Sequence, residues 1–261
     1  MQQTQHDGLA SCGIEPYELG CGVPELDGFI DQGLITGVDA PLTSGKEAAV
    51  YRCRTPRGAE APFLAAKVYH EHAAATFRRS ATYFEGRERN LKPRAVRAIR
   101  AGTAHGRRVL ASVWVSTEYE VLTRLTEAGA DTPRPVAMAE RAILMEYIGD
   151  EKRPAPQLHG GTLTKADGPR LWRQILENIE IFLSEHLVHG DLSPYNVLLW
   201  EGRARIIDVP QAVDARFNQS AFDLLRRDIE NTARFFERFG LALSPTRIAL
   251  DLWDRYRRAR L

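Results

Sequence analysis

The chain has 261 residues, of which 44% are hydrophobic and 26% charged, as in an ordinary globular protein. This length suits one large domain or two coupled lobes with a substantial core. A formal net charge of +1 excludes a strong overall field that would draw the molecule to nucleic acid. Three cysteines without a CxxC pair are too few for a disulfide framework.

No apolar run is long enough to cross a membrane, and the first residues, MQQTQHDGLA, lack the features of a signal peptide. We therefore expect a cytoplasmic protein without membrane contacts. Residues 78–108 are locally basic, with ten Lys and Arg against two acids, or about +8. This stretch is interpreted either as a solvated Arg-rich loop or as a surface for a ribosomal or RNA-containing particle.

The N-terminal half is rich in strand patterns. Residues 24–34 predict a short helix with Leu26, Phe29 and Ile30 on one face. Residues 37–55 predict two strands joined by a glycine-bearing turn. The apolar run at 61–70 predicts a buried strand that carries Lys67.

Next come broken helices and a loop over 71–110, because glycines and a proline interrupt the pattern. Residues 112–129 predict a helix, and 133–150 predict two strands, the second at 142–148.

The C-terminal half is mainly helical. Residues 166–189 predict a long amphipathic helix, and 220–240 predict another, with Ser220 as its N-cap. Between them, 197–209 predict a hairpin. Strands first and helices second indicate two lobes with a hinge near 145–149.

Two features of the first half suit phosphate binding. SGKEAAVY at 44–51 is a turn whose backbone N–H groups can approach phosphates, although a plain hairpin turn has the same pattern. Lys67 lies in an apolar strand, where an ammonium is stable only when paired. A phosphate and a carboxylate would satisfy it, and Glu118 on the following helix is the candidate partner. Alternatively, Lys67 reaches water from the end of its strand.

The run LVHGDLSPYN at 187–196 has the D-x-x-x-x-N spacing of a kinase catalytic loop. In such a loop Asp191 accepts or orients the proton of the attacking hydroxyl, Asn196 gives an amide oxygen to a divalent metal, and His189 braces the chain. Asp208 follows two isoleucines, so its carboxylate would emerge from a buried strand where it can chelate magnesium. Each aspartate alone is equally typical of a turn or strand end, but the order of the pieces indicates phosphoryl transfer.

SGKEAAVY, LAAKVYH, MEYIGDEKRPAPQL, LVHGDLSPYNVLL and IIDVPQAV together resemble the RIO family of atypical serine protein kinases, in the branch without an N-terminal winged helix. The resemblance extends over about residues 34–240. Ala49 stands where that family usually has Asn, and Gly190 where it usually has Ala. No A-P-E follows Asp208, so no ordinary activation segment is expected, as in that family.

The resemblance implies ATP and Mg²⁺ as cofactors, with Mn²⁺ as an alternative. Lys67 would hold the α- and β-phosphates while paired with Glu118, and Asp191 would be the catalytic aspartate. The implied nucleotide-binding residues are Ser44, Gly45, Lys46, Val50, Lys67, Met145, Glu146 and Ile148. The implied metal ligands are Asn196 and Asp208. The implied substrate is a serine or threonine in a protein, including this chain itself, and some members act more like ATPases in ribosome maturation.

The implied fold is α+β, a two-lobed protein-kinase-like fold with a β-rich N-lobe and a mainly helical C-lobe. We expect an N-terminal extension with a short helix at 1–32. The N-lobe would cover 33–148, with a flexible Arg-rich loop at about 71–110, and the C-lobe would cover 149–261.

Two other functions stay open on the sequence. A small-molecule phosphotransferase of the aminoglycoside or choline kinase type shares HGDL followed by Pro and Asn, and Gly190 favours it. SGKEAAVY and IIDVPQ disfavour it, since such enzymes usually have an aromatic residue just after the metal-binding aspartate. The other is an ATP-driven binding switch on ribosomal particles, which the basic stretch at 78–108 suggests.

Overall fold

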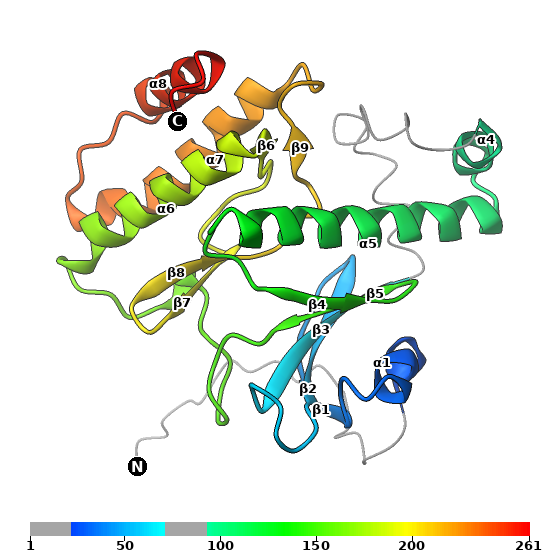
Figure 1. Ribbon diagram of the computed structural model, residues 1–261. Helices are drawn as coiled ribbons and strands as arrows, with labels where there is room; N and C mark the ends of the chain where they lie inside the picture. Colours follow the sequence, from blue (N-terminus) through cyan, green and yellow to red (C-terminus); the bar gives the residue numbers. More distant parts are fainter. Residues whose placement is uncertain (1–21, 71–92) are drawn as a thin grey trace, which may run out of the picture.

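The computed structural model describes residues 22–70 and 93–261, which form an antiparallel sheet followed by a mainly helical half (Figure 1). All neighbouring strands of the sheet are antiparallel. In spatial order the strands are β1 (Gly37–Ser44), β2 (Ala48–Arg54), β3 (Phe63–Tyr69), β5 (Ala142–Glu146) and β4 (Pro135–Met138). The predicted strands and the α+β, kinase-like class are thus confirmed, although β5 ends two residues earlier than expected.

A short helical segment precedes the sheet, as the sequence predicts. It consists of η1 (Pro24–Leu26) and α1 (Asp27–Asp31). Leu26 and Phe29 are fully buried, but Ile30 is exposed and so lies off the predicted buried face. A single helical turn can cover only a narrow stripe, and successive residues point about 100° apart around the axis.

The alternation of side chains along β3 gives the sheet two different faces. Ala66 and Val68 pack in the smaller apolar cluster with Phe29 of α1. Ala65 and Tyr69 point the other way and join the main core. That second face is the one along which the long helix α5 runs (Figure 1).

Residues 93–127 form two helices, α4 (Pro93–Ala101) and α5 (Ala104–Glu127). The broken helices expected within 71–110 are thus confirmed, but the loop expected there does not extend to residue 110. Residues 71–92 lie outside the described residues. Pro93 stands at the first position of α4, where proline is tolerated, and Gly102 has a φ of +70° at the corner between the helices. Pro93 and Gly102 therefore bound these helices, and Thr103 caps α5 by accepting a hydrogen bond from the Gly106 N–H at 3.0 Å.

The second half packs helices around the main core and adds short strand pairs (Figure 1). Its helices are η3 (Leu158–Gly160), α6 (Asp167–Ser184), α7 (Ala221–Phe236), η4 (Glu237–Phe239) and α8 (Pro245–Arg257). Its strand pairs are β6 (Leu187–Val188) with β9 (Val213–Asp214), and β7 (Val197–Trp200) with β8 (Arg203–Ile206). The predicted hairpin is confirmed. The predicted helix over 166–189 ends at Ser184, because His186 adopts a φ of +57° and the chain then pairs with β9.

Within residues 22–70 and 93–261, no helix combines the length and the apolar character that crossing a bilayer requires.

Replacing Gly106 with Ala should destabilise the protein, although alanine favours a helix over glycine by about 1 kcal/mol. The added methyl group would overlap the backbone of Ala98, so α4 and α5 would have to separate. Overpacking of this kind costs about 1–3 kcal/mol. Urea unfolding measures the change, and Gly28→Ala is the matched control because its methyl group would meet nothing within 4 Å. Equal effects of the two substitutions would contradict the close contact between α4 and α5.

Candidate functional site

A cleft of about 900 Å³ is lined by residues of both halves. It collects almost all of the functional residues that the sequence predicts. Those that line it are Gly45, Lys46, Val50, Lys67, Glu118, Met145, Glu146, Ile148, Asp191, Asn196 and Asp208. Among the described residues, Thr43 and Gly45 line the cleft but Ser44 does not.

Lys67 is buried at the centre of this arrangement. Its Nζ lies 2.7 Å from Glu118 Oε1 and 2.6 Å from Asp208 Oδ1. Burial opposes the charge, but the two carboxylates outweigh it and hold the pKa of Lys67 well above its ordinary value. Only 8% of the residue is exposed, so the alternative in which Lys67 reaches bulk water is wrong.

Glu118 is held from two sides. Its Oε1 faces Lys67, and its Oε2 accepts a hydrogen bond from the Tyr69 hydroxyl. Tyr69 follows Lys67 by two residues on β3, so both side chains point to the same face of the sheet. Sequence analysis did not single out Tyr69; the signal was an aromatic residue with a hydroxyl at the next inward position of the strand.

The loop at 189–196 is fixed by hydrogen bonds at both ends. The His189 ring donates through Nε2 to the Ile207 carbonyl at 3.1 Å and accepts from the Asp191 N–H at Nδ1. Burial lowers the pKa of His189, which agrees with a neutral ring that donates and accepts. The Asn196 side-chain Nδ2 donates to the Asp191 carbonyl at 2.8 Å. His189 therefore braces the loop, and Asp191 and Asn196 lie side by side.

Asp208 closes the cleft from the end of β8. Its φ of +65° lies in the left-handed region, which aspartate tolerates better than bulky or β-branched residues do. The chain thereby turns away from the strand just where the carboxylate meets Lys67. The side chain is still 45% exposed, so Asp208 also faces the open space of the cleft.

The turn between β1 and β2 carries a further carboxylate that the sequence analysis did not select. Glu47 lines the cleft, and its carbonyl accepts the His70 N–H at 2.9 Å. Burial and the negative charge of Asp208 raise the pKa of the Glu47 carboxyl. The turn itself is closed by the Gly45 N–H, which donates to the Ala48 carbonyl at 2.9 Å.

Asp228 on α7 anchors the loop at 189–196. Sequence analysis did not identify this residue. Its carboxylate accepts the Gly190 N–H at 2.7 Å and the Leu192 N–H at 2.9 Å. Arg227 donates to the Gly190 carbonyl. Burial raises the pKa of Asp228 to about 7, although the two N–H donors favour the ionised form. The loop that carries Asp191 thus depends on a carboxylate that is 2% exposed.

The donor set fits a magnesium ion whose remaining ligands come from phosphates and water. Asp208 offers a carboxylate, and Asn196 an amide oxygen, in the same cleft. In the part of the chain that the structure describes, no group of three or more His, Cys, Asp or Glu could hold a metal alone. Magnesium commonly takes only one or two carboxylates from the protein and the rest from phosphate and water. The residues present therefore fit a nucleotide-bound magnesium ion better than a closed metal site.

The pH dependence of stability should change when Asp228 is replaced by Asn. The folded state holds the Asp228 proton up to about pH 7, whereas an unfolded chain releases it near its ordinary pKa of 3.8. The contribution of this group to the unfolding free energy is thus full below about pH 3.8 and falls as pH rises to about 7, by up to about 4 kcal/mol in all. Part of this fall is complete at pH 5, so urea unfolding of both proteins at about pH 5 and pH 8 should show about 3 kcal/mol of it. A difference between the proteins that is the same at both pH values would contradict the raised pKa.

Comparison with known proteins matches residues 49–248 to the RIO domain. Serine/threonine-protein kinase rio1 of Schizosaccharomyces pombe is 31% identical over 212 residues, which cover 80% of this chain and 40% of that protein. Human serine/threonine-protein kinase RIO1 is 30% identical over 221 residues, or 84% of this chain and 36% of the relative. RIO-type serine/threonine-protein kinase Rio1 of Thermoplasma acidophilum is 30% identical over 186 residues, or 71% of this chain and 91% of the relative.

The chain thus spans less than half the length of the Schizosaccharomyces and human relatives. The matched region nevertheless contains the cleft from Val50 to Asp208. It also covers most of the sheet and most of the helical half. The chain therefore belongs to the RIO domain family, as its motifs predict.

Proposed function

We propose that this protein transfers the γ-phosphoryl group of ATP, with a divalent metal, to serine or threonine residues of proteins. The observation that carries the proposal is the position of Lys67 between Glu118 and Asp208, in one cleft with Asp191 and Asn196. The relatives named serine/threonine-protein kinase support it. Phosphoryl transfer needs positioned cations and a metal rather than covalent chemistry by the protein, and this set of residues supplies both needs.

Different residues of the cleft would bind different parts of the nucleotide. Lys67 would bind the α- and β-phosphates while Glu118 keeps its ammonium in place. The backbone of Glu146 and Ile148 would bind adenine at the hinge, with Met145 and Val50 as apolar walls of the cleft. Gly45 and Lys46 would cover the phosphates from the turn. Ser44 is less well supported in this role, because it does not line the cleft.

Asp208 and Asn196 would hold the metal, which we propose is Mg²⁺, with Mn²⁺ as the alternative. When bound, the metal would neutralise charge on the phosphate oxygens. Asp191 would accept or orient the proton of the attacking hydroxyl, and its place beside Asn196 keeps it near the metal side. His189 and Asp228 would hold the loop rather than react.

The substrate we propose is a serine or threonine of a protein, with this chain itself as one candidate. ATP hydrolysis without transfer to protein is the competing outcome of the same site. The family match disfavours a small-molecule phosphotransferase of the aminoglycoside or choline kinase type. The protein is incubated with labelled ATP and with kanamycin as an aminoglycoside substrate. Label in protein, in kanamycin and in free phosphate, measured separately, distinguishes protein phosphorylation, small-molecule phosphorylation and ATP hydrolysis.

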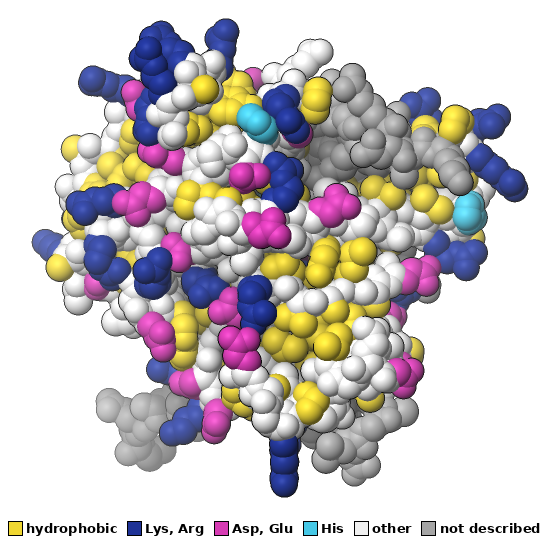
Figure 2. All heavy atoms as spheres, viewed as in Figure 1, with side chains coloured by type: hydrophobic (Ala, Val, Ile, Leu, Met, Phe, Trp, Pro, Cys, Tyr) yellow, Lys and Arg dark blue, Asp and Glu magenta, His cyan; other side chains and the backbone are white. Residues whose placement is uncertain are grey.

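A second surface, formed by α4 and the start of α5, suits an anionic partner. Arg94, Arg97 and Arg100 recur every three residues of α4, and Arg107 and Arg108 follow on α5; all five are exposed. Residues 93–117 contain no Asp or Glu. Figure 2 shows Lys and Arg side chains gathered over this end of the molecule, at the right of the view. We propose that this basic surface contacts the phosphates of an RNA-containing particle, such as a ribosomal one.

Substitutions at the two aspartates should separate binding from turnover. Asp191→Asn should lower the rate of phosphoryl transfer by about 100- to 10,000-fold, the range for loss of a general base. Its affinity for Mg-ADP should stay near that of wild type. Asp208→Asn should remove both activity and the magnesium dependence of ADP binding. Lys67→Ala should lower both the activity and the affinity for ADP. Autophosphorylation and calorimetric ADP titration measure these effects. Wild-type autophosphorylation and ATP hydrolysis in Asp208→Asn would refute the proposed site.

Reversing charge on the basic surface should weaken association with ribosomal particles without affecting the cleft. Arg97→Glu combined with Arg107→Glu should abolish co-sedimentation that wild type shows at low salt, because contacts with phosphates release counterions and weaken as salt rises. Asp191→Asn should co-sediment like wild type. Absence of wild-type association even at low salt would exclude this partner.

A further inference from the structure

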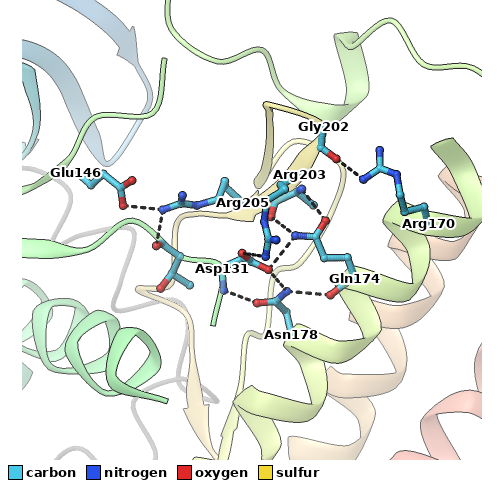
Figure 3. A network of polar contacts seen from close by, with 10 residues as sticks. Asp131, Glu146, Arg170, Gln174, Asn178, Gly202, Arg203 and Arg205 are labelled. Carbon is cyan, nitrogen blue, oxygen red and sulfur yellow. Dashed lines mark hydrogen bonds and ion pairs between the residues drawn. The ribbon is translucent and has the colours of Figure 1, made fainter. Parts of the chain in front are cut away.

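The hinge is anchored from behind by an arginine of the C-terminal half. Arg205 on β8 donates from Nη2 to Glu146 Oε2 at 2.6 Å and to the Thr132 carbonyl at 3.0 Å (Figure 3). Glu146 is the last residue of β5, where the sheet passes into the hinge. The pair is partly sheltered from water, with side-chain exposures of 22% for Arg205 and 35% for Glu146. One guanidinium thus joins the hinge to the loop between α5 and β4.

Further hydrogen bonds restrict both the backbone and the side chain of Glu146. Its carboxylate also accepts the Arg134 N–H at 3.1 Å, and its own N–H donates to the Arg134 carbonyl at 2.8 Å. Backbone and side chain are therefore both fixed at the residue whose backbone faces the proposed adenine site. The Arg205 guanidinium is the partner that comes from the other half of the molecule.

A network of hydrogen bonds centred on Asp131 holds β8, the strand that carries Arg205. The Ile206 N–H donates to the Asp131 carbonyl at 2.8 Å, and Arg203 pairs with the Asp131 carboxylate at 2.8 Å. Gln174 and Asn178 of α6 donate to the same carboxylate at 2.8 Å and 3.0 Å (Figure 3). Burial opposes ionisation of Asp131, but these donors lower its pKa and keep it charged. Through Asp131, helix α6 thus fixes the strand that carries Arg205.

The same strand leads directly to the metal side of the cleft. Ile207 follows β8, and its N–H donates to the Asn196 carbonyl at 3.0 Å, immediately before Asp208. Arg205 thus lies three residues from the proposed metal ligand and in contact with the proposed adenine-binding hinge. A single short strand fixes the distance between the two ends of the nucleotide site.

The local energetics argue that stability alone does not explain Arg205. Among the described residues, its Nε–H is buried without a hydrogen-bond partner, and so is the hydroxyl of the adjacent Thr132. Each such group is unfavourable for folding, and an apolar side chain would avoid the problem. Exceptions of this kind concentrate where function constrains the sequence.

We propose that Arg205 is a positioning residue for nucleotide binding, which holds the hinge at Glu146 in register with the metal ligands Asn196 and Asp208. This inference rests on the proposed use of ATP by the cleft. Without the guanidinium, Glu146 loses its link to the helical half and the hinge samples positions in which adenine and phosphates cannot both be bound. The penalty falls on nucleotide affinity, because Asp191 and its loop are held separately by Asp228.

Arg205→Met is the central test, since methionine keeps much of the aliphatic stem but removes the donors. The Kd for Mg-ADP and the KM for ATP should rise by about 3- to 30-fold, the usual range for residues that couple sites through a network. The kcat at saturating ATP should change by less than about twofold. Arg170→Met is the matched control, because Arg170 binds the same hairpin at the Gly202 carbonyl but does not touch the hinge (Figure 3). It should leave both constants unchanged.

A double-mutant cycle identifies the contact. If Arg205 acts through the Glu146 carboxylate, adding Glu146→Gln to Arg205→Met should weaken ADP binding no further than the stronger single substitution. Arg205→Lys keeps a charge within reach of Glu146 and should lose less than Arg205→Met. Arg205→Gln, which lacks the charge, replaces Arg205→Met if that variant does not fold. Unchanged ADP affinity in Arg205→Met or, failing that, in Arg205→Gln would overturn the inference, as would additive losses or an equal loss in Arg170→Met. Failure of wild type to bind Mg-ADP would instead refute the proposed function.

Discussion

The buried ammonium of Lys67 is the constraint on which the rest of the structure depends. A charge in this position is stable only in contact with opposite charges, and Glu118 and Asp208 supply them from two distant parts of the chain. Helix α5 must therefore lie along the inner face of the sheet at the depth that brings Glu118 to β3. The end of β8 must reach the same point from the helical half. Breaking a buried pair such as Lys67–Glu118 costs about 3–5 kcal/mol, because the remaining charge stays buried without compensation.

Each wall of the cleft has its own anchor in addition to this central pair. On the sheet side, the Tyr69 hydroxyl orients the Glu118 carboxylate, so Lys67 meets a fixed oxygen. On the helical side, Asp228 binds the backbone N–H groups on both sides of Asp191. In both cases a buried side chain that lies outside the open cleft fixes a residue that faces it. Such support keeps the proposed reacting groups, Lys67 and Asp191, in one geometry.

Local sequence patterns predict the parts of the site that are contained in short segments. The apolar run that forms β3 identifies Lys67, the D-x-x-x-x-N spacing identifies Asp191, and two isoleucines before Asp208 identify a strand end. Glu118 follows from the requirement that a buried lysine be paired. Asp228 could not be found in this way, because an aspartate in an amphipathic helix is usually solvated and its partners lie 36 and 38 residues away. The loop expected up to residue 110 is too long for a related reason, since Gly106, at the contact of α4 and α5, is required by packing between helices rather than by turn geometry.

The carboxylates along the cleft lie in different electrostatic surroundings. The lining contains five carboxylates, those of Glu47, Glu118, Glu146, Asp191 and Asp208, but only two lysines. Glu118 shares Lys67 with Asp208, and Glu146 is paired with Arg205 behind the hinge. Glu47 and Asp191 have no such cation in contact among the described residues, and burial together with the charge of Asp208 raises the pKa of each. A divalent cation on Asp208 would reverse that effect, because it would place positive charge where Glu47 and Asp191 now meet negative charge. If the proposed metal binds at Asp208, the ionisation of Asp191, and with it the proposed capacity to accept a proton, depends on occupancy of that position.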